Sequence, residues 1–375
     1  MSSPSRALNL QVVGTVAFVL QGLYISSYGP MYPRLLEQFH LAQSEVGWIA
    51  SANFLGSSTA VLASTWLMGR VGARRILMVA PLLLALGAMG MGVAPTWGLA
   101  LLCALVAGLG AGSITSGINI TLSSTPDRPA AVLNAVNAMF GLGCVLGPLL
   151  VASTPVSAVR WPFVLIGLLA LTLLGFTRQL PKITPSQLPR DSAVGAKRGI
   201  TLFTLLFAVY VMTEAGAGSW MTTHLAPQLG LRGAALIASG FWLAFMCGRL
   251  VGAPLTVRFP PRLVVPAAAS LAIVAAGLAN LPQWSVAAYL LLGLALGPIF
   301  PTTVAWYRQH LTPRRLSIAM TGGSLGAVAV QPLVGMTVSR LGLPAIPLTL
   351  LVLACALLMM TAWVRWFQRT SSSGA

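Results

Sequence analysis

The stretch Tyr210-Val-Met-Thr-Glu214-Ala-Gly-Ala-Gly218-Ser-Trp220 lies in the middle of an apolar segment that runs from about residue 200 to residue 226. Glu214 is the only acidic residue that hydropathy places deep inside a segment long enough to cross a bilayer. A carboxylate at mid-bilayer costs at least about 2.5 kcal/mol, so such a residue normally faces a bundle interior or a wet cavity. We therefore expect Glu214 to be functional. The alternative is a structural carboxyl that is protonated or paired with Arg249.

The composition is that of a polytopic membrane protein. Of the 375 residues, 57% are hydrophobic and only 7% are charged, which is far outside the usage of soluble domains. The net charge of +17 does not indicate nucleic-acid binding, because the cations lie in short connections between apolar runs. The four cysteines and three histidines have neither metal-ligand nor catalytic spacing. The sequence therefore predicts no enzyme activity, no metal and no other cofactor.

Apolar stretches of about twenty residues predict twelve membrane spans. We place the spans at residues 7–32, 45–68, 76–95, 97–121, 131–152, 161–178, 200–226, 233–256, 263–281, 283–308, 317–338 and 344–365. Seventeen of the 22 basic residues then fall on the side of the termini, four fall on the opposite side, and Arg249 lies inside a span. Because basic residues favour the cytoplasmic side, both termini are expected in the cytoplasm, in a bacterial inner membrane.

A polar, proline-rich connection at residues 179–199 separates two halves, which predicts an N-terminal six-helix bundle at 1–178, a cytoplasmic linker at 179–199 and a C-terminal bundle at 200–375. The halves resemble each other in sequence. Gly108-Leu-Gly-Ala-Gly112 matches Gly293-Leu-Ala-Leu-Gly297, and Phe54-Leu55 matches Trp242-Leu243. Duplicated halves are typical of transporters, in which two similar bundles rock about a site near the midplane of the membrane.

Two six-span halves, a central loop and the basic turn Gly69-Arg70-Val-Gly72-Ala-Arg74 resemble the major facilitator superfamily over essentially the whole chain. That resemblance implies an all-α membrane protein of twelve helices in two pseudo-symmetric bundles. The loop motif of the family is Gly-x-x-x-Asp-Arg-x-Gly-Arg-Arg, and this chain has Thr65 and Gly69 in place of the first Gly and the Asp. The usual latch between helices, which depends on that Asp, is therefore in question here.

Three stretches look like the branch of fucose, galactose and glucose symporters and sodium-dependent glucose transporter-like proteins. They are Leu133-Asn134-x-x-Asn137-x-x-Phe140-Gly141, Tyr210-x-x-x-Glu214 through Trp220, and Gly240-Phe241-Trp242 with Gly248-Arg249. Asn137 stands where that branch has His, and spans 1 and 4 contain no acidic residue. Glu214 is then the sole embedded residue available to couple transport to H⁺ or Na⁺.

Polar and aromatic side chains recur at helical spacing in the apolar spans, which aligns them on one face of each helix. Amides, phenols and indoles would offer a neutral polyhydroxy solute fixed hydrogen-bond partners and apolar ring faces. The alternative is that each polar side chain only ties two helices together. The predicted substrate-binding residues are Gln21, Tyr24, Tyr28, Asn53, Asn119, Asn134, Asn137, Trp220, Trp242 and Gln331.

A second set is expected to act in gating or conformational change, through the basic turns, Arg249 inside span 8, and a kink where two prolines remove backbone donors inside span 10. This set comprises Arg70, Gly72, Arg74, Arg249, Arg258, Pro298 and Pro301. Glu214 and Arg249 are separated by about 10 Å along the membrane normal, at 1.5 Å per residue. A gate role for Arg249 is therefore as well supported as a direct ion pair with Glu214.

The sequence as a whole predicts a monomeric secondary transporter of a small neutral solute, a sugar by preference, coupled to a cation through Glu214. A proton-driven exporter of hydrophobic or cationic compounds is the alternative, because a lone embedded acid beside Trp220, Trp242 and Phe245 would serve it equally. A non-transporting sensor or lipid-handling protein of the same fold is a third interpretation. Uptake of sugars would support the first interpretation, and efflux of lipophilic cations would support the second. A sensor or lipid-handling protein should show neither activity.

Overall fold

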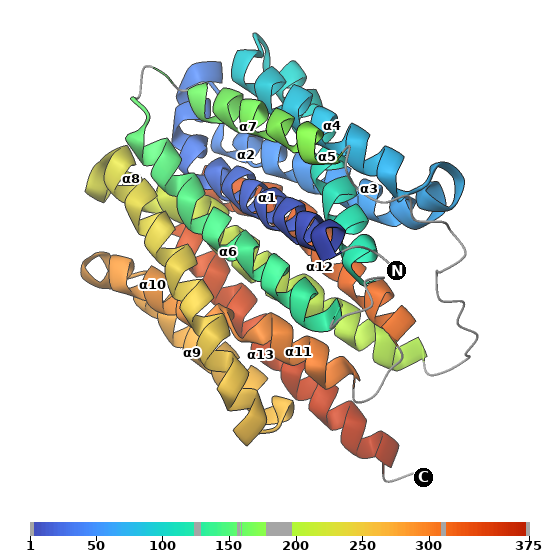
Figure 1. The fold of residues 1–375 in the computed structure, drawn as a ribbon. Coiled ribbons are helices and arrows are strands. Elements are labelled where there is room, and N and C mark those ends of the chain that lie inside the picture. Colours follow the sequence, from blue (N-terminus) through green and yellow to red (C-terminus); the bar gives the residue numbers. More distant parts are fainter. Residues whose placement is uncertain are drawn as a thin grey trace. The chain divides into compact units, whose positions relative to one another are not determined.

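The structure, a computed structural model, describes residues 4–123, 129–155, 158, 160–177, 197–308 and 313–372. Every regular element in these ranges is a helix (Figure 1). The chain packs into two compact units, one of Met1–Leu41 with Trp48–Arg190 and the other of Ala42–Gly47 with Asp191–Ala375. Most of the predicted linker at 179–199 lies outside the described residues, which resume at Lys197.

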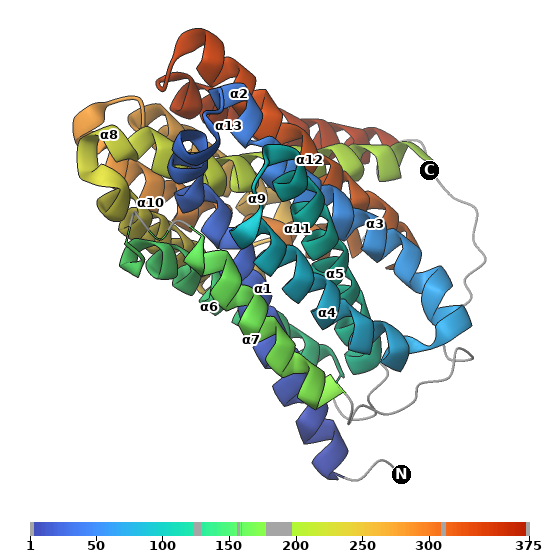
Figure 2. The same cartoon turned by 90° about the horizontal axis from the view of Figure 1, so that it is seen from above.

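Unit 1 consists of six long helices. They are α1 (Pro4–Phe39), α3 (Trp48–Val71), α4 (Ala73–Val93), α5 (Trp97–Ser123), α6 (Pro129–Ser153) and α7 (Trp161–Thr177). Helix α1 packs on α6, α3 packs on α5, and α4 packs on both α5 and α7. The adjacency of α4 and α5 can be followed in both Figure 1 and Figure 2.

Unit 2 contains the other half of the chain and the short helix α2 (Gln43–Val46), which packs on α12. Its longer elements are α8 (Lys197–Arg258), α9 (Pro261–Leu278), α10 (Ser285–Leu296), α11 (Ile299–Arg308), α12 (Pro313–Leu341) and α13 (Ala345–Ser372), with a 3-10 turn at Pro282–Trp284. Helix α8 bends at Gly230, whose φ of 71° is not helical. Because glycine has no Cβ, it adopts this conformation without strain.

Each of the twelve predicted spans falls on helical segments, with the tenth divided between α10 and α11, and the fold prediction is confirmed. Within the described ranges, nine helices are long and apolar enough to cross a membrane, and α8 is one of them although it holds two predicted spans. Helix α7 is apolar but shorter, at Trp161–Gly175. Lipid leaves no water for backbone groups, so a chain this apolar must satisfy its backbone hydrogen bonds inside helices.

Glycines set the closest helix contacts in unit 1. A Cβ atom on Gly108 would lie 2.1 Å from the carbonyl oxygen of Asn53, and one on Gly112 would lie 2.2 Å from that of Ser57. Only glycine permits α5 to approach α3 so closely. Contacts of this kind replace the hydrophobic effect as the basis of helix association in lipid.

The equivalent glycines make the equivalent contact in unit 2. A Cβ atom on Gly293 would lie 2.5 Å from the Phe241 carbonyl oxygen, and one on Gly297 would lie 2.3 Å from that of Phe245. Helix α10 therefore packs on the second half of α8 as α5 packs on α3. The internal repeat seen in the sequence is thus present in the packing inside each unit.

The tenth span is interrupted where the sequence predicted a kink. Helix α10 ends before Gly297 and α11 starts at Ile299, with Pro298 between them. The ladder of backbone hydrogen bonds resumes with the Thr302 amide donating to the Pro298 carbonyl at 3.2 Å. The expected role of this kink in gating stays a prediction.

Candidate functional site

Glu214 lies in the first half of α8, and its side chain is partly exposed. Tyr210 precedes it by one helical turn, so the two side chains share a face of the helix. The Tyr210 hydroxyl, the Glu214 carboxyl and the Arg249 guanidinium lie within electrostatic range of one another. The bend at Gly230 brings the two halves of α8 together, and in this way Arg249 of the second half comes close to Glu214 of the first.

Arg249 is held beside the carboxyl without a direct ion pair. Its guanidinium carbon lies 4.6 Å from the centroid of the Phe245 ring, one turn earlier on α8, in a cation–π contact. Among the described residues, no hydrogen bond satisfies its buried Nε atom. The arginine therefore keeps its positive charge close to Glu214 and still has donors to offer.

Aromatic rings surround this charged cluster. The Trp242 and Phe245 rings are 5.5 Å apart in an edge contact, and the Trp242 ring packs against Gly218, one turn beyond Glu214. On the other side, the Phe300 ring of α11 lies 6.0 Å from that of Tyr210. These rings give the site apolar walls.

Two polar atoms of the cluster, the Trp242 indole Nε1 and Arg249 Nε, are buried without a hydrogen-bond partner among the described residues. The Tyr210 hydroxyl has Glu214 and Arg249 within reach. An unpaired buried polar group costs about 1–3 kcal/mol by protein mutational data, so native structures normally satisfy such groups. Unpaired donors in the cluster that holds an embedded carboxyl are available to water, an ion or a polar solute.

The predicted residues of spans 1 and 2 form a different kind of network, inside unit 1. The Asn53 amide donates to the Tyr24 hydroxyl at 3.1 Å and to the Ala104 carbonyl at 3.3 Å. The Tyr24 hydroxyl is hydrogen-bonded to that of Tyr28, which in turn donates to the Met91 sulfur at 3.4 Å. All three predicted residues are at most 1% exposed. Their polar atoms tie α1, α3, α4 and α5 together.

Gln21 belongs to the same core. Its Nε2 donates to the Ala111 carbonyl at 2.6 Å, and its Oε1 accepts from the Thr115 hydroxyl at 2.8 Å, both on α5. The side chain is 4% exposed. Gln21 is therefore well placed to hold α1 against α5.

The remaining predicted binding residues are distributed over both units. In unit 1, Asn137 donates to Asn119 at 3.3 Å, and both side chains are partly exposed. The side chain of Asn134 lies outside the described residues. In unit 2, Gln331 of α12 donates to the Ala215 carbonyl at 3.4 Å, directly after Glu214 in the chain, and Trp220 is fully buried.

Comparison with known proteins agrees with this architecture. The model of the Major Facilitator Superfamily matches residues 14–302. The chain belongs to this superfamily. A curated relative, "Uncharacterized MFS-type transporter YcaD" of Salmonella heidelberg (strain SL476), is 26% identical over 359 residues, which cover 89% of this chain and 88% of the relative. The protein is accordingly a multi-pass membrane transporter of the superfamily.

Two solved structures extend the likeness in fold. The nucleoside transporter NupG superposes with a TM-score of 0.75 at 12% identity, covering 96% of this chain and 98% of NupG. A variant of the E. coli fucose:proton symporter FucP gives 0.65 at 17% identity, covering 96% of this chain and 99% of FucP. At these identities the likeness concerns the fold alone.

Apart from Arg249, which lies inside α8, the predicted gate residues of this superfamily member lie at turns and helix ends. Gly72, with a φ of 82°, lies between α3 and α4, where only glycine is unstrained. Arg70 is exposed at the end of α3, and Arg74 is partly buried in the first turn of α4. Arg258 ends α8 and is exposed. Pro298 is buried at the break before α11, and Pro301 is exposed in its first turn.

Two residues of this transporter were missed by the sequence analysis. The sequence did not indicate a role for Phe300, because an apolar residue in an apolar span does not stand out from its neighbours. Arg34 is one of the four basic residues placed opposite the termini, two residues beyond predicted span 1, but α1 continues to Phe39 and the arginine is only 3% exposed. It donates to the carbonyls of Val151 and Thr154 at 3.0 and 3.1 Å, at the end of α6. A helix C-terminus favours a cation, so Arg34 caps α6.

Proposed function

We propose that the protein is a secondary active transporter of a small neutral polar solute of the sugar class, driven by a cation that binds and leaves Glu214. It would act as a monomer by alternating access, in a bacterial inner membrane with both termini in the cytoplasm. The observation that carries this proposal is the embedded carboxyl of Glu214 close to the Arg249 guanidinium and the Tyr210 hydroxyl, with Arg249 Nε left without a partner in the described residues. The repeat of two six-helix bundles supports the alternating-access part.

The charge of Arg249 supports a neutral solute rather than a cationic one. Its guanidinium already occupies the face of the Phe245 ring, 4.6 Å from the centroid. A lipophilic cation seeking the aromatic rings and Glu214 would meet this positive charge, and like charges at such range repel. A neutral solute would meet no such penalty.

Hydrogen-bond chemistry supports a polyhydroxylated solute. The Trp242 indole donates only, Arg249 donates only, and the hydroxyl of Tyr210 both donates and accepts. The hydroxyl groups of a sugar match this mixture, and the rings of Trp242 and Phe300 offer surfaces to the apolar face of a sugar ring. The names of the structural neighbours, a nucleoside transporter and a fucose:proton symporter, point to the same solute class.

Cation coupling follows from the change in charge at Glu214. When the carboxyl is ionised, its negative charge is balanced by nearby Arg249, and the Tyr210 hydroxyl has a strong acceptor within reach. When a proton binds, that attraction is lost and Arg249 and Tyr210 can turn to other partners, including the solute. Sodium bound to the ionised form would have a similar effect. The cation thereby changes the number of donors that the site presents to the solute.

The decisive experiment compares Glu214→Gln with Glu37→Gln in proteoliposomes. Both changes remove one carboxylate of the same shape, but Glu37 is exposed near the end of α1. With a panel of labelled sugars and nucleosides, we expect Glu214→Gln to lose uphill accumulation driven by an ion gradient and to keep solute counterflow. Glu37→Gln should keep both activities. Gradient-driven accumulation by Glu214→Gln would refute coupling through this residue.

Efflux of hydrophobic compounds is the second candidate function, favoured by the ring cluster of Trp242, Phe245 and Phe300. Proton-driven extrusion of neutral lipophilic dyes, with no transport of any sugar or nucleoside, would replace our proposal by this one. For either function, varying pH at fixed sodium and sodium at fixed pH identifies the coupling cation.

A further inference from the structure

Unit 2 carries an apolar groove that the proposed transport site does not use. It measures about 490 Å³ and lies between the second half of α8, α9 and α10. Its walls are entirely apolar and include Gly248, Val251 and Phe259 with Leu263 and Leu271 of α9. Val251 and Phe259 are 54% and 50% exposed, so the groove opens on the surface of the unit. The lipid-facing surface of a single helix is convex, whereas the surface here forms a hollow between three helices.

The length of the groove matches one leaflet of a bilayer. Along α8 it extends from Gly248 to Phe259, which at 1.5 Å per residue is about 16 Å. Half of a typical hydrocarbon core is about 15 Å. Pro298, at the break between α10 and α11, also lines the groove. A single acyl chain inserted from one membrane surface would therefore extend from the surface to the break.

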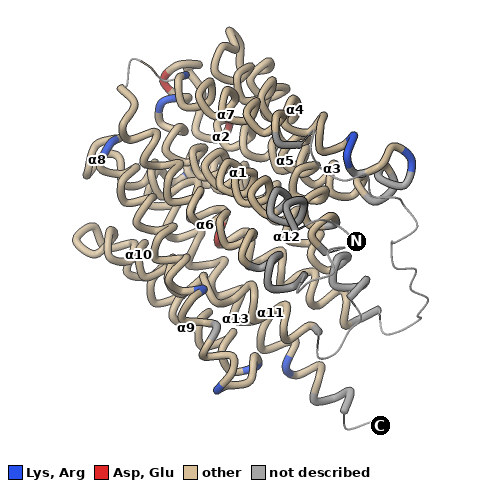
Figure 3. Tube along the Cα trace, in the orientation of Figure 1, with Lys and Arg blue, Asp and Glu red and all other residues tan. Residues whose placement is uncertain are grey.

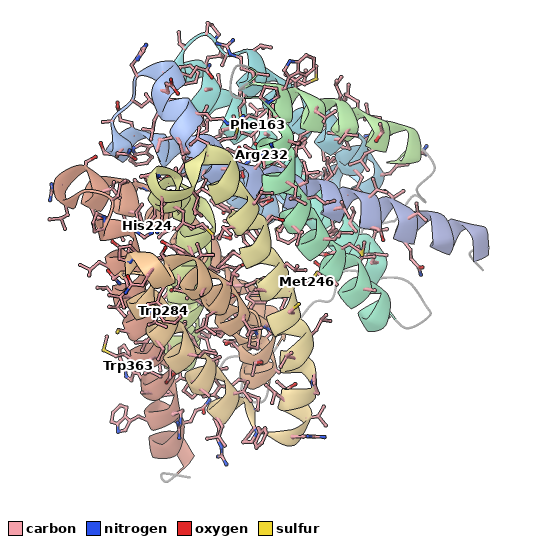
Figure 4. All side chains as sticks on the ribbon, turned by 90° about the vertical axis from the view of Figure 1, so that its left-hand side faces the viewer. Phe163, His224, Arg232, Met246, Trp284 and Trp363 are labelled. Carbon is pink, nitrogen blue, oxygen red and sulfur yellow. The ribbon has the colours of Figure 1, made fainter. Side chains whose placement is uncertain are left out.

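Two arginines lie at the other end of the groove. Arg258 is the last residue of α8 and Arg262 the second residue of α9, so they flank Phe259 and Leu263 of the groove. Both are exposed, and in the parts of the chain that the structure describes neither has a hydrogen bond or an ion pair. The turn between α8 and α9 is blue, for Lys or Arg, in Figure 3. In Figure 4, the yellow half of α8 that carries Met246 runs toward this turn.

We propose that this groove binds one anionic phospholipid of the surrounding membrane, with an acyl chain between α8 and α9 and the phosphate at Arg258 and Arg262. Guanidinium groups bind phosphate through paired hydrogen bonds, and two of them at the polar end of an apolar groove complement a head group that carries a net negative charge. A zwitterionic lipid would fill the same groove without this charge complementarity. A docked helix is a worse occupant, because a helix with its side chains is about 10 Å across and would overfill the groove.

The test uses the full-length protein in phosphatidylcholine vesicles that contain increasing fractions of phosphatidylglycerol with a photoreactive diazirine on one acyl chain. We expect crosslinks within residues 248–271. Arg258→Gln with Arg262→Gln should raise the phosphatidylglycerol fraction needed for half-labelling about 30-fold, since each basic residue near an anionic surface is worth about 1 kcal/mol. The matched control, Arg232→Gln with Arg340→Gln, removes two arginines elsewhere in unit 2 and should leave labelling unchanged.

Three further arms decide the identity of the ligand. Replacing both arginines with lysine should restore most of the labelling, and Ala268→Phe should block it by filling the groove without any change in charge. A phosphatidylcholine probe that labels the groove equally well would overturn the selectivity for an anionic lipid. Another outcome is that inorganic phosphate protects Arg258 and Arg262 from a guanidinium-modifying reagent while acyl labelling stays unchanged. That result would assign the two arginines to a soluble anion and would overturn the lipid phosphate as their ligand. Labelling outside residues 248–271 would overturn the site itself.

Discussion

Replacing Gly143 by alanine tests the packing of α1 against α6 most directly. A Cβ atom at this position would lie 2.0 Å from the Val19 carbonyl oxygen and 2.8 Å from the Leu23 amide nitrogen. Ordinary contacts of a Cβ atom exceed 3.0 Å, so α1 and α6 must separate by about 1 Å or bend. Overpacking of this kind typically costs about 1–3 kcal/mol, and here both obstacles are backbone atoms that cannot rotate away.

The neighbouring residue reports the separation. Cys144 is 1% exposed and is not in a disulfide, whereas the other three cysteines can be changed to serine to leave a single thiol. We expect Gly143→Ala to accelerate the labelling of Cys144 by a membrane-permeable maleimide roughly 5- to 150-fold, the factor that corresponds to about 1–3 kcal/mol. Thermal unfolding in detergent should begin at a lower temperature.

A matched control is available on α7. A Cβ atom on Gly175 would meet nothing within 4 Å, so Gly175→Ala adds the same methyl group without a clash. This change should leave Cys144 labelling unaltered and raise stability slightly, because alanine is the better helix former. If Gly143→Ala and Gly175→Ala label at the same rate, the close contact between α1 and α6 is not what holds unit 1 together.

Other changes probe the cap, the amide pair and the topology. Arg34→Gln should lower the free energy of unfolding by about 2–3 kcal/mol through the loss of charged hydrogen bonds to α6, as measured by thermal denaturation. Arg34→Lys should restore only part of it, because an ammonium lacks the second nitrogen, Nη1, that donates to the Pro155 carbonyl at 3.5 Å. Asn137→Ala should weaken solute binding by about 1–3 kcal/mol if the amide meets a solute hydroxyl, and unchanged affinity with normal expression would return Asn137 to helix packing. A green fluorescent protein fused after Ala375 should fluoresce and an alkaline phosphatase fused there should stay inactive; the reverse result would invert the predicted orientation.

The spans and the repeat were predictable because lipid imposes strong rules on a chain. Apolar length fixes the helices, and the glycines at 108 and 112 recur at 293 and 297 with the same packing. Polar residues follow no such rule. Asn53 and Glu214 each lie in an apolar span, yet Asn53 is 0% exposed and its amide nitrogen is bonded inside unit 1, while Glu214 is partly exposed beside Arg249 and Tyr210. Helical periodicity predicts which residues share one face of a helix. It does not predict which groups of the neighbouring helix pack against that face.

The interrupted tenth span has a mechanical consequence. Its first piece, α10, is clamped to the second half of α8, where Gly297 fits against the Phe245 backbone and Pro298 against Gly252. Its second piece, α11, touches the first half of α8 instead, where the Phe300 ring lies 6.0 Å from the Tyr210 ring.

Span 10 therefore connects the two halves of α8 through two helical pieces, with a hinge at Gly297 and Pro298. A shift of Tyr210 when the charge of Glu214 changes would push on Phe300 and turn α11 about this hinge, while α10 stays in place. On the proposal that a cation binds Glu214, this linkage would convert the binding of one proton into a rotation of α11.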